Sequence, residues 1–184
     1  TNAHTVSNIS APAPSVTGLS EYGWSALGYR ANTTASTAAY TVTTANANIK
    51  PAYNVANTLY AVYNRDLSMA YNGNGATGGE TASHTSKQYY NTNGGKTSVT
   101  FTTSANGFTK TGYTFNKWAN DSVTGTQVAA GSNATAFTPD VQSPDTTKTM
   151  YAIWNTNTAV ITIKQNNSVW NNSGIKVSLS ASDT

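Results

Sequence analysis

The sequence predicts a mostly β protein made of tandem small β modules, with a β-hairpin at its C-terminal end. Short stretches alternate apolar and polar residues, and examples are residues 40–43, 98–102 and 160–164. Clusters rich in Asn and Gly separate such stretches, at residues 72–75, 93–95 and 130–133. A period of two places successive side chains on opposite faces of a sheet, and Asn-Gly pairs favour tight turns. The pattern indicates no amphipathic helix longer than about two turns.

The composition excludes several classes of protein. Charged residues make up 9% of the 184 residues, whereas an average soluble domain has about 25%. Aromatic residues reach 10%, which argues against a disordered chain. The lysines are scattered singly, so the net charge of +3 forms no basic patch for nucleic acid. Cys is absent and no apolar run is long enough to span a membrane, so we expect no thiol chemistry, no cysteine-bound zinc and no membrane insertion.

An internal repeat organises the chain. The pattern apolar-Tyr-Ala-apolar-aromatic-Asn occurs at residues 59–64 and again at 150–155. Upstream of each copy a Gly stands six residues before a Trp, and these pairs are Gly18 with Trp24 and Gly112 with Trp118. Only the second copy has an opening strand-like segment, at residues 67–71. The predicted divisions are therefore 1–64 as an incomplete repeat-like β module, 65–156 as a complete module, and 157–184 as a hairpin that opens a further β module.

The repeated aromatic residues are the best candidates for the core, because a small sheet needs large apolar side chains to offset chain entropy. The predicted structural core anchors are Trp24, Tyr60, Trp118, Tyr151 and Trp154. Other aromatic residues lie in or after polar stretches, where exposed rings could stack on a sugar. These candidate ligand-stacking residues are Trp170, Tyr89 and Tyr90.

Three segments, in order along about ninety residues, resemble a known bacterial family. They are residues 67–76, which read LSMAYNGNGA, residues 106–118, which read NGFTKTGYTFNKW, and residues 149–154, which read TMYAIW. This part of the chain resembles the Listeria–Bacteroides repeat, or internalin B-type repeat, most strongly over residues 66–155. The resemblance implies a compact β-grasp-like module, repeated in tandem on large surface proteins as a stalk, spacer or adhesive unit.

The residues needed for catalysis are not assembled in this sequence. His4 lies in a predicted tail, and His84 is predicted to be a solvated loop residue. Asp140 and Asp145 flank a Pro in a predicted turn, where capping explains them better than acid–base catalysis. The glycines at 73–79 lack the Gly-Lys-Ser/Thr ending of a phosphate-binding loop. We therefore predict no enzyme activity and no catalytic, cofactor-binding or metal site.

The sequence and the resemblance together indicate a non-catalytic module at the cell surface or outside the cell, acting as a stalk or adhesin segment. One alternative is a carbohydrate-binding accessory module, which an exposed row of aromatic residues would favour. Another is a subunit of an extracellular filament, completed by strand exchange, because the first module lacks an opening strand. The expected partners are a host or cell-surface glycan or protein, and neighbouring subunits that add a β-strand.

Overall fold

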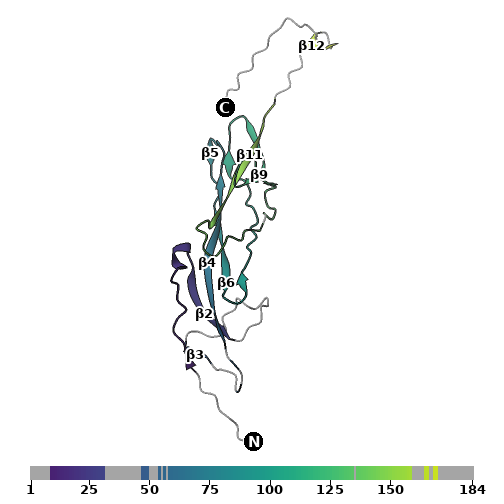
Figure 1. Cartoon of the computed structure of the whole chain (residues 1–184). Coiled ribbons are helices and arrows are strands. Elements are labelled where there is room, and N and C mark those ends of the chain that lie inside the picture. Colours follow the sequence, from purple (N-terminus) through teal and green to yellow (C-terminus); the bar gives the residue numbers. More distant parts are fainter. Residues whose placement is uncertain are drawn as a thin grey trace.

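The computed structural model describes residues 9–31, 47–49, 54, 56, 58–134, 136–158, 164–165 and 168–169. In this part of the chain the protein is mostly β, as the sequence predicts. A seven-stranded sheet runs along most of the length of this described part (Figure 1). The one helical element is a single 3-10 turn, η1 (Ser20–Tyr22). No helix in these residues is both long and apolar enough to span a membrane.

Six strands form a continuous row in the main sheet, and a seventh joins it at the side. The row is β10 (Gln127–Val128), β9 (Tyr113–Asn120), β11 (Thr147–Thr156), β4 (Leu59–Asn72), β6 (His84–Asn91) and β7 (Gly95–Lys96). The seventh strand is β2 (Ser25–Ala31), which pairs with β4. Three two-stranded sheets pair β1 (Ile9–Ser10) with β3 (Ala47–Ile49), β5 (Gly78–Gly79) with β8 (Phe108–Thr109), and β12 (Lys164–Gln165) with β13 (Ser168–Val169).

Strand β4 is the axis of the sheet. It is 14 residues long, and it joins the end of the first repeat copy to the predicted opening strand of the second module. Along one edge it pairs with β6. Along the other edge it pairs antiparallel with β2 as far as Asn64, and then parallel with β11 from Ser68 onward. The predicted boundary between residues 64 and 65 therefore lies inside one continuous strand, and both predicted modules share one sheet. Their division into tandem β-grasp-like units stays a prediction.

The two repeat copies pair with their neighbouring strands in different registers. Each Tyr-Ala strand pairs antiparallel with the strand that follows the Gly of its Gly–Trp pair. In the second copy Ala152 lies opposite Trp118, inside β9. In the first copy Ala61 lies opposite Tyr29, and Trp24 immediately precedes β2. Repetition in the sequence therefore does not produce two equivalent strand pairs.

Trp118 is at the centre of the hydrophobic core. Its side chain is 0% exposed, and its indole N–H donates to Ser104 O at 2.9 Å. Three aromatic rings surround it, with centroids at 4.7 to 6.3 Å from its own: Tyr71, Phe108 and Phe115. The buried residues of the same core are Leu67, Met69, Val99, Phe101, Ala134, Met150 and Ala152.

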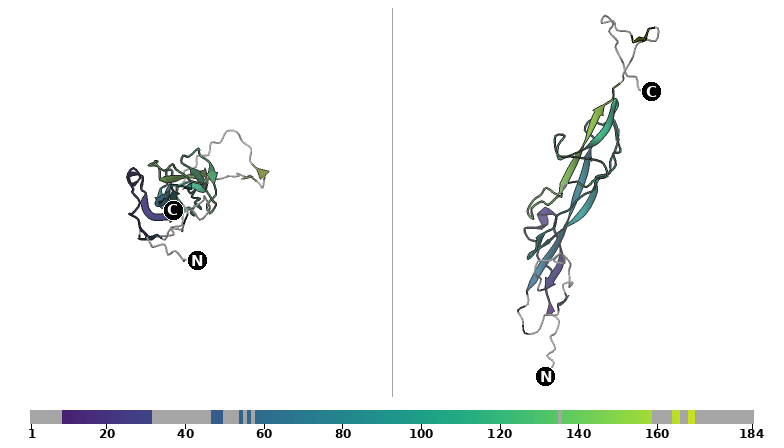
Figure 2. Two further views of the ribbon diagram at one scale, coloured as in Figure 1. Left: turned by 60° about the horizontal axis from the view of Figure 1, so that its bottom comes forward. Right: turned by 90° about the vertical axis from the view of Figure 1, so that its right-hand side faces the viewer.

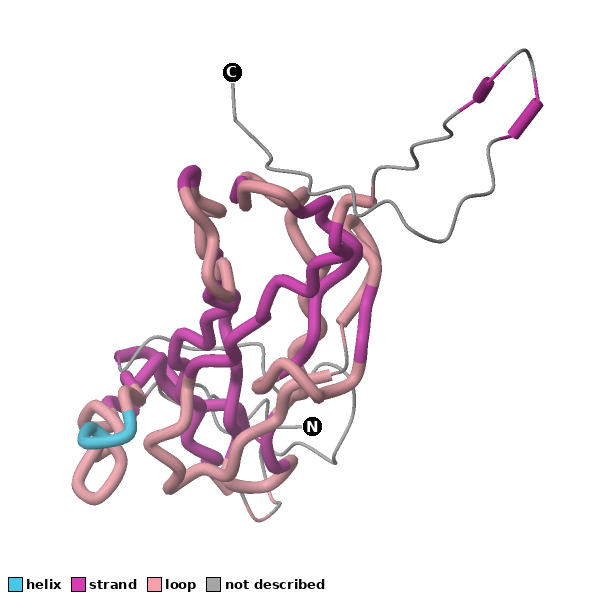
Figure 3. Tube along the Cα trace, turned by 90° about the horizontal axis from the view of Figure 1, so that it is seen from above, coloured by secondary structure: helices cyan, strands magenta, loops and turns pink. Residues whose placement is uncertain are grey.

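Irregular chain, not a second sheet, covers this core. The predicted strand at 98–102 does not form; it makes only isolated bridges, Val99 with Phe137 and Thr102 with Asn133. A turn at residues 129–132, in which Gly131 has a φ of 75° and Ser132 N donates to Ala129 O at 3.2 Å, precedes the bridging residues 133 and 137. Figure 2 shows the teal and green loops wrapped along the flank of the sheet. Seen from above, in Figure 3, loop surrounds the strands on several sides.

The predicted anchors divide into buried and half-buried residues. Trp24 and Trp118 are 2% and 0% exposed, and Trp154 packs against the core while partly buried. Tyr60 and Tyr151 are only partly buried and lie outside the core cluster. Alternation explains Tyr151: its neighbours Met150 and Ala152 face the core, so Tyr151 points to the opposite face.

Two further expectations have different outcomes. His84 lies in β6, where its ring stacks on Phe101 at 5.4 Å, so the expectation of a solvated loop histidine is wrong. The rings of Tyr71 and Phe101 both pack against it. Residues 40–43 and 160–163, most of the predicted C-terminal hairpin, and the ligand-stacking candidate Trp170 lie outside the described residues.

Replacing Trp118 with Ala should destabilise the protein by about 3–5 kcal/mol, because the change removes a fully buried ring and leaves a cavity among three others. Urea unfolding, followed by circular dichroism, would measure the loss. Val123→Ala is the matched control, since Val123 is 44% exposed. A Trp118→Ala protein that unfolds at the same urea concentration as the control would contradict this assignment of the core.

Candidate functional site

A buried arginine lies halfway along β4. Tyr63, Arg65, Leu67 and Met69 alternate along the strand, and all four are buried. Arg65 therefore occupies an inward-facing position between core residues, with only 1% of its surface exposed. Burial lowers the pKa of its guanidinium, although the group stays charged at ordinary pH.

Every hydrogen-bond donor type of this guanidinium has a partner. Its Nε donates to Gln88 Oε1 at 2.8 Å. Its Nη1 donates to the carbonyls of Tyr22 and Ser143 at 3.2 and 3.0 Å, and its Nη2 to those of Pro139 and Asp140 at 3.3 and 2.8 Å. An Arg side chain has five N–H groups, so these five bonds match its full capacity. Arg65 thus ties η1 to the loop that precedes β11.

Trp24 contacts both Arg65 and the loop before β11. The Arg65 guanidinium lies 4.4 Å from the centroid of the Trp24 ring, within the range of a cation–π contact. The Trp24 indole N–H donates to Val141 O at 2.7 Å. We call this junction the seam: residues 19–24 meet residues 139–146 across Arg65.

An aromatic cluster extends from the seam. Tyr90 stacks on Tyr63 at 5.9 Å and packs against Trp24 at 5.8 Å. The Tyr63 hydroxyl donates to Ser15 O at 2.9 Å, which attaches the segment before η1. Burial raises the pKa of the Tyr63 hydroxyl, and the nearby Tyr29 and Tyr90 hydroxyls raise it further.

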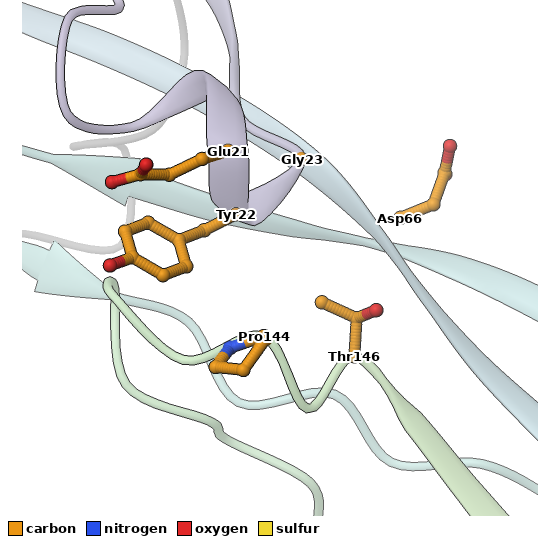
Figure 4. A pocket seen from close by; sticks show the side chains of 6 residues that line it. All are labelled: Glu21, Tyr22, Gly23, Asp66, Pro144 and Thr146. Carbon is orange, nitrogen blue, oxygen red and sulfur yellow. The ribbon is translucent and has the colours of Figure 1, made fainter.

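A shallow hollow lies on one side of the seam (Figure 4). Its lining comes from η1, β4 and the loop before β11: Glu21, Tyr22, Gly23, Asp66, Pro144 and Thr146. Figure 4 shows the carboxylates of Glu21 and Asp66 pointing away from each other. Asp66 is also paired with Lys87 at 2.8 Å. The two acids therefore do not form the facing pair that glycoside hydrolysis requires.

A larger hollow, of about 620 Å³, also borders the seam. Tyr90 lines it together with Leu19, Val141, Gln142 and the ion pair between Lys96 and Asp140, whose charged atoms are 3.0 Å apart. Of the two described ligand-stacking candidates, Tyr90 thus borders a hollow. Tyr89 is absent from this lining, and its backbone N–H donates to Thr97 Oγ1 at 2.9 Å.

The described residues contain no group of three or more His, Cys, Asp or Glu side chains that could hold a metal ion. Three acids are occupied in ion pairs with lysines: Asp66, Asp121 and Asp140. The seam can therefore fix two chain segments against each other, and its polar groups are used in doing so.

Sequence reasoning did not single out Arg65, Gln88 or Tyr63. One signal for Arg65 was present, because an Arg at the inward position of an alternating strand has to be satisfied inside the protein. Four of its five partners are backbone carbonyls, from residues 22 and 139–143, which no side-chain pattern could identify.

No protein-family model, curated protein or solved structure matches this chain. The resemblance to the Listeria–Bacteroides repeat therefore stays a prediction.

Replacing Arg65 with Met should lower the free energy of unfolding by at least about 2 kcal/mol, because four carbonyls and the Gln88 amide lose their donor. Lys87→Met is the matched control. It removes a Lys from an exposed ion pair one strand away, which should cost under about 1 kcal/mol. Urea unfolding compares the two variants. Equal stabilities would show that Arg65 does not hold the seam.

The raised pKa of Tyr63 predicts a pH-dependent effect of Tyr63→Phe. Up to about pH 10 the parent should be the more stable protein, because its hydroxyl keeps the bond to Ser15 O. Above that pH the unfolded tyrosine ionises before the folded one, so the parent loses stability that the Phe variant keeps. Thermal melts between pH 7 and pH 11 would follow the difference. A constant difference across that range would contradict the prediction.

Proposed function

We propose that this chain is a non-catalytic, load-bearing segment of a bacterial surface protein, acting as a stalk or adhesin unit. The observation that carries the proposal is the continuity of β4, which pairs with strands along both of its edges and joins β2 to β11 within one sheet. A segment whose task is to hold a distance needs a continuous hydrogen-bonded axis of this kind.

The direction of the strands supports a role under tension. The β1–β3 pair lies beyond the start of β4, and the end of β11 lies at the opposite end of the sheet (Figures 1 and 2). A force between Ser10 and Thr156 would therefore act along β4 and β11, whose pairing is parallel. Such a force shears many hydrogen bonds at once, whereas a peeling force breaks them singly.

Both anchoring points of the load have extra attachments. At one end, β11 pairs with β4 on one edge and with β9 on the other. At the other end, a force that enters at Ser10 reaches the seam, with Arg65 and Trp24, before it reaches β2. The low charge and the resemblance to a bacterial surface repeat agree with a position outside the cell.

The load-bearing role predicts that unfolding under force depends on the pulling direction. The chain lacks Cys, so handles can be attached at introduced cysteines. Ser10→Cys with Asn157→Cys loads the sheet in shear. Thr111→Cys with Asn157→Cys peels β9 from β11, since Asn157 N donates to Gly112 O at 2.9 Å at the same end.

Optical-tweezer measurements should give a higher rupture force for the shear pair, and Arg65→Met should lower that force but leave the peeling force unchanged. Equal forces in both directions would refute the mechanical role. An antibody against the chain should also label intact cells of the source organism, and labelling that needs permeabilised cells would refute the surface location.

A further inference from the structure

A third hollow lies near the end of β11 and the start of β9, away from the seam in the middle of the sheet. It has a volume of about 390 Å³, within the size range of small-molecule sites. Four aromatic side chains line it: Phe108, Tyr113, Phe115 and Trp154. They come from β8, β9 and β11, and we call the hollow the β8–β9 pocket.

The core supports the aromatic wall of this pocket. Phe115 packs on Trp118 at 4.9 Å and meets Trp154 edge-on at 5.9 Å. The Trp154 indole N–H donates to Gly73 O at 2.9 Å, which fixes its ring. Tyr113 stands outside this layer and is 40% exposed. Tyr113 thus presents an exposed ring to a pocket whose other aromatic residues are packed on the core.

Apart from Lys110, the rest of the lining carries hydroxyl and amide groups: Thr77, Asn106, Thr109, Thr111 and Thr114. Bonds within the pocket wall fix several of them. Thr111 N donates to Thr77 Oγ1 at 3.1 Å, and the Asn106 side chain bonds both the N–H and the carbonyl of Phe108. A ligand with an apolar ring face and a rim of hydroxyls matches such a wall, and a pyranose sugar has both.

Lys110 is the one charged residue in the pocket lining, which contains no acid. Its ammonium donates to Asn74 O at 3.0 Å and lies 4.7 Å from the centroid of the Tyr113 ring. An ammonium has three donors, so two remain to reach a ligand. A cation held in place without a carboxylate beside it favours an anionic group on that ligand, because binding then needs no reorganisation.

We propose that the β8–β9 pocket binds a carboxylate-bearing sugar residue of a glycan, with its ring against Tyr113 and its carboxylate on Lys110. A single ammonium is too little for a nucleic acid, which requires several phosphate contacts. The proposal goes beyond the load-bearing role and does not depend on it, since the pocket and the seam involve different residues.

Nuclear magnetic resonance titration of the whole chain would test the site. The probes are tetragalacturonate, a hyaluronan tetrasaccharide and sialyllactose, with cellotetraose and lactose as neutral controls. The anionic probes should shift the amide signals of residues 110–114 and the Trp154 indole N–H, and the neutral ones should do so more weakly. If none of the three anionic probes shifts these signals at about 10 mM, the proposal is wrong.

Variants separate the two contacts. Tyr113→Ala should weaken binding about tenfold, whereas Tyr113→Phe keeps the ring and should bind within about twofold of the parent. Lys110→Met keeps the aliphatic stem and should lose about tenfold for the anionic probes alone. Val123→Ala, on an exposed loop outside the pocket, should change nothing.

Three results would overturn the assignment. They are equal affinity for anionic and neutral probes, unchanged binding by Lys110→Met, and signal shifts that map to residues outside the pocket. Because Tyr113 is 40% exposed, its replacement should leave the fold intact, and a dispersed amide spectrum would verify this. If Tyr113→Ala does not fold, the Lys110→Met comparison decides the question by itself.

Discussion

The structure depends on the satisfaction of one buried cation. Removing a guanidinium from water costs several kcal/mol unless each of its donors finds an acceptor. The acceptors of Arg65 are four backbone carbonyls and the Gln88 amide, and they come from three separate parts of the chain. If η1 or the loop before β11 moved away, donors of the buried guanidinium would lose their acceptors, and the free energy of the folded state would rise. The four carbonyls depend on Arg65 in turn, because the guanidinium supplies their hydrogen-bond donors in the interior.

The location of Arg65 explains why such an interaction is needed there. One edge of β4 changes partner between Asn64, where the pairing with β2 ends, and Ser68, where the pairing with β11 begins. A break of this kind would leave backbone groups and side chains without neighbours in the middle of the sheet. Arg65 lies at this change of partner, and its side chain bonds carbonyls of η1 and of the loop before β11. Where the pairing with β11 begins, Ser68 N donates to Thr146 O at 2.9 Å.

Local patterns in the sequence predicted local features well. The mostly β class follows from alternation, and the buried state of Trp118 follows from its place in a repeated motif. The turns at 72–75 and 93–95 also lie where Asn and Gly predicted them, with Asn74 and Gly75 at positive φ. These features depend on a few neighbouring residues, so the sequence around them contains the necessary information.

Features set by distant chain segments were not predictable in the same way. The motif suggested Tyr151 as a core anchor, but the face that a strand residue occupies depends on which neighbour is buried, and here that is Ala152. The continuity of β4 was missed because its two halves were assigned to separate repeat patterns. The carbonyl partners of Arg65 are invisible in any pattern of side chains, since every residue has a carbonyl.

The Trp of the repeated Gly–Trp pair has a different structural role in each copy. Trp118 lies among the rings of Tyr71, Phe108 and Phe115, and its indole N–H donates to a core-side carbonyl, that of Ser104. The corresponding Trp24 also donates its indole N–H to a carbonyl, but its ring faces the Arg65 cation as well. A large aromatic ring with one polar edge suits both settings. The repeat therefore preserves the ring, while the partner set decides whether that ring anchors a core or joins two segments.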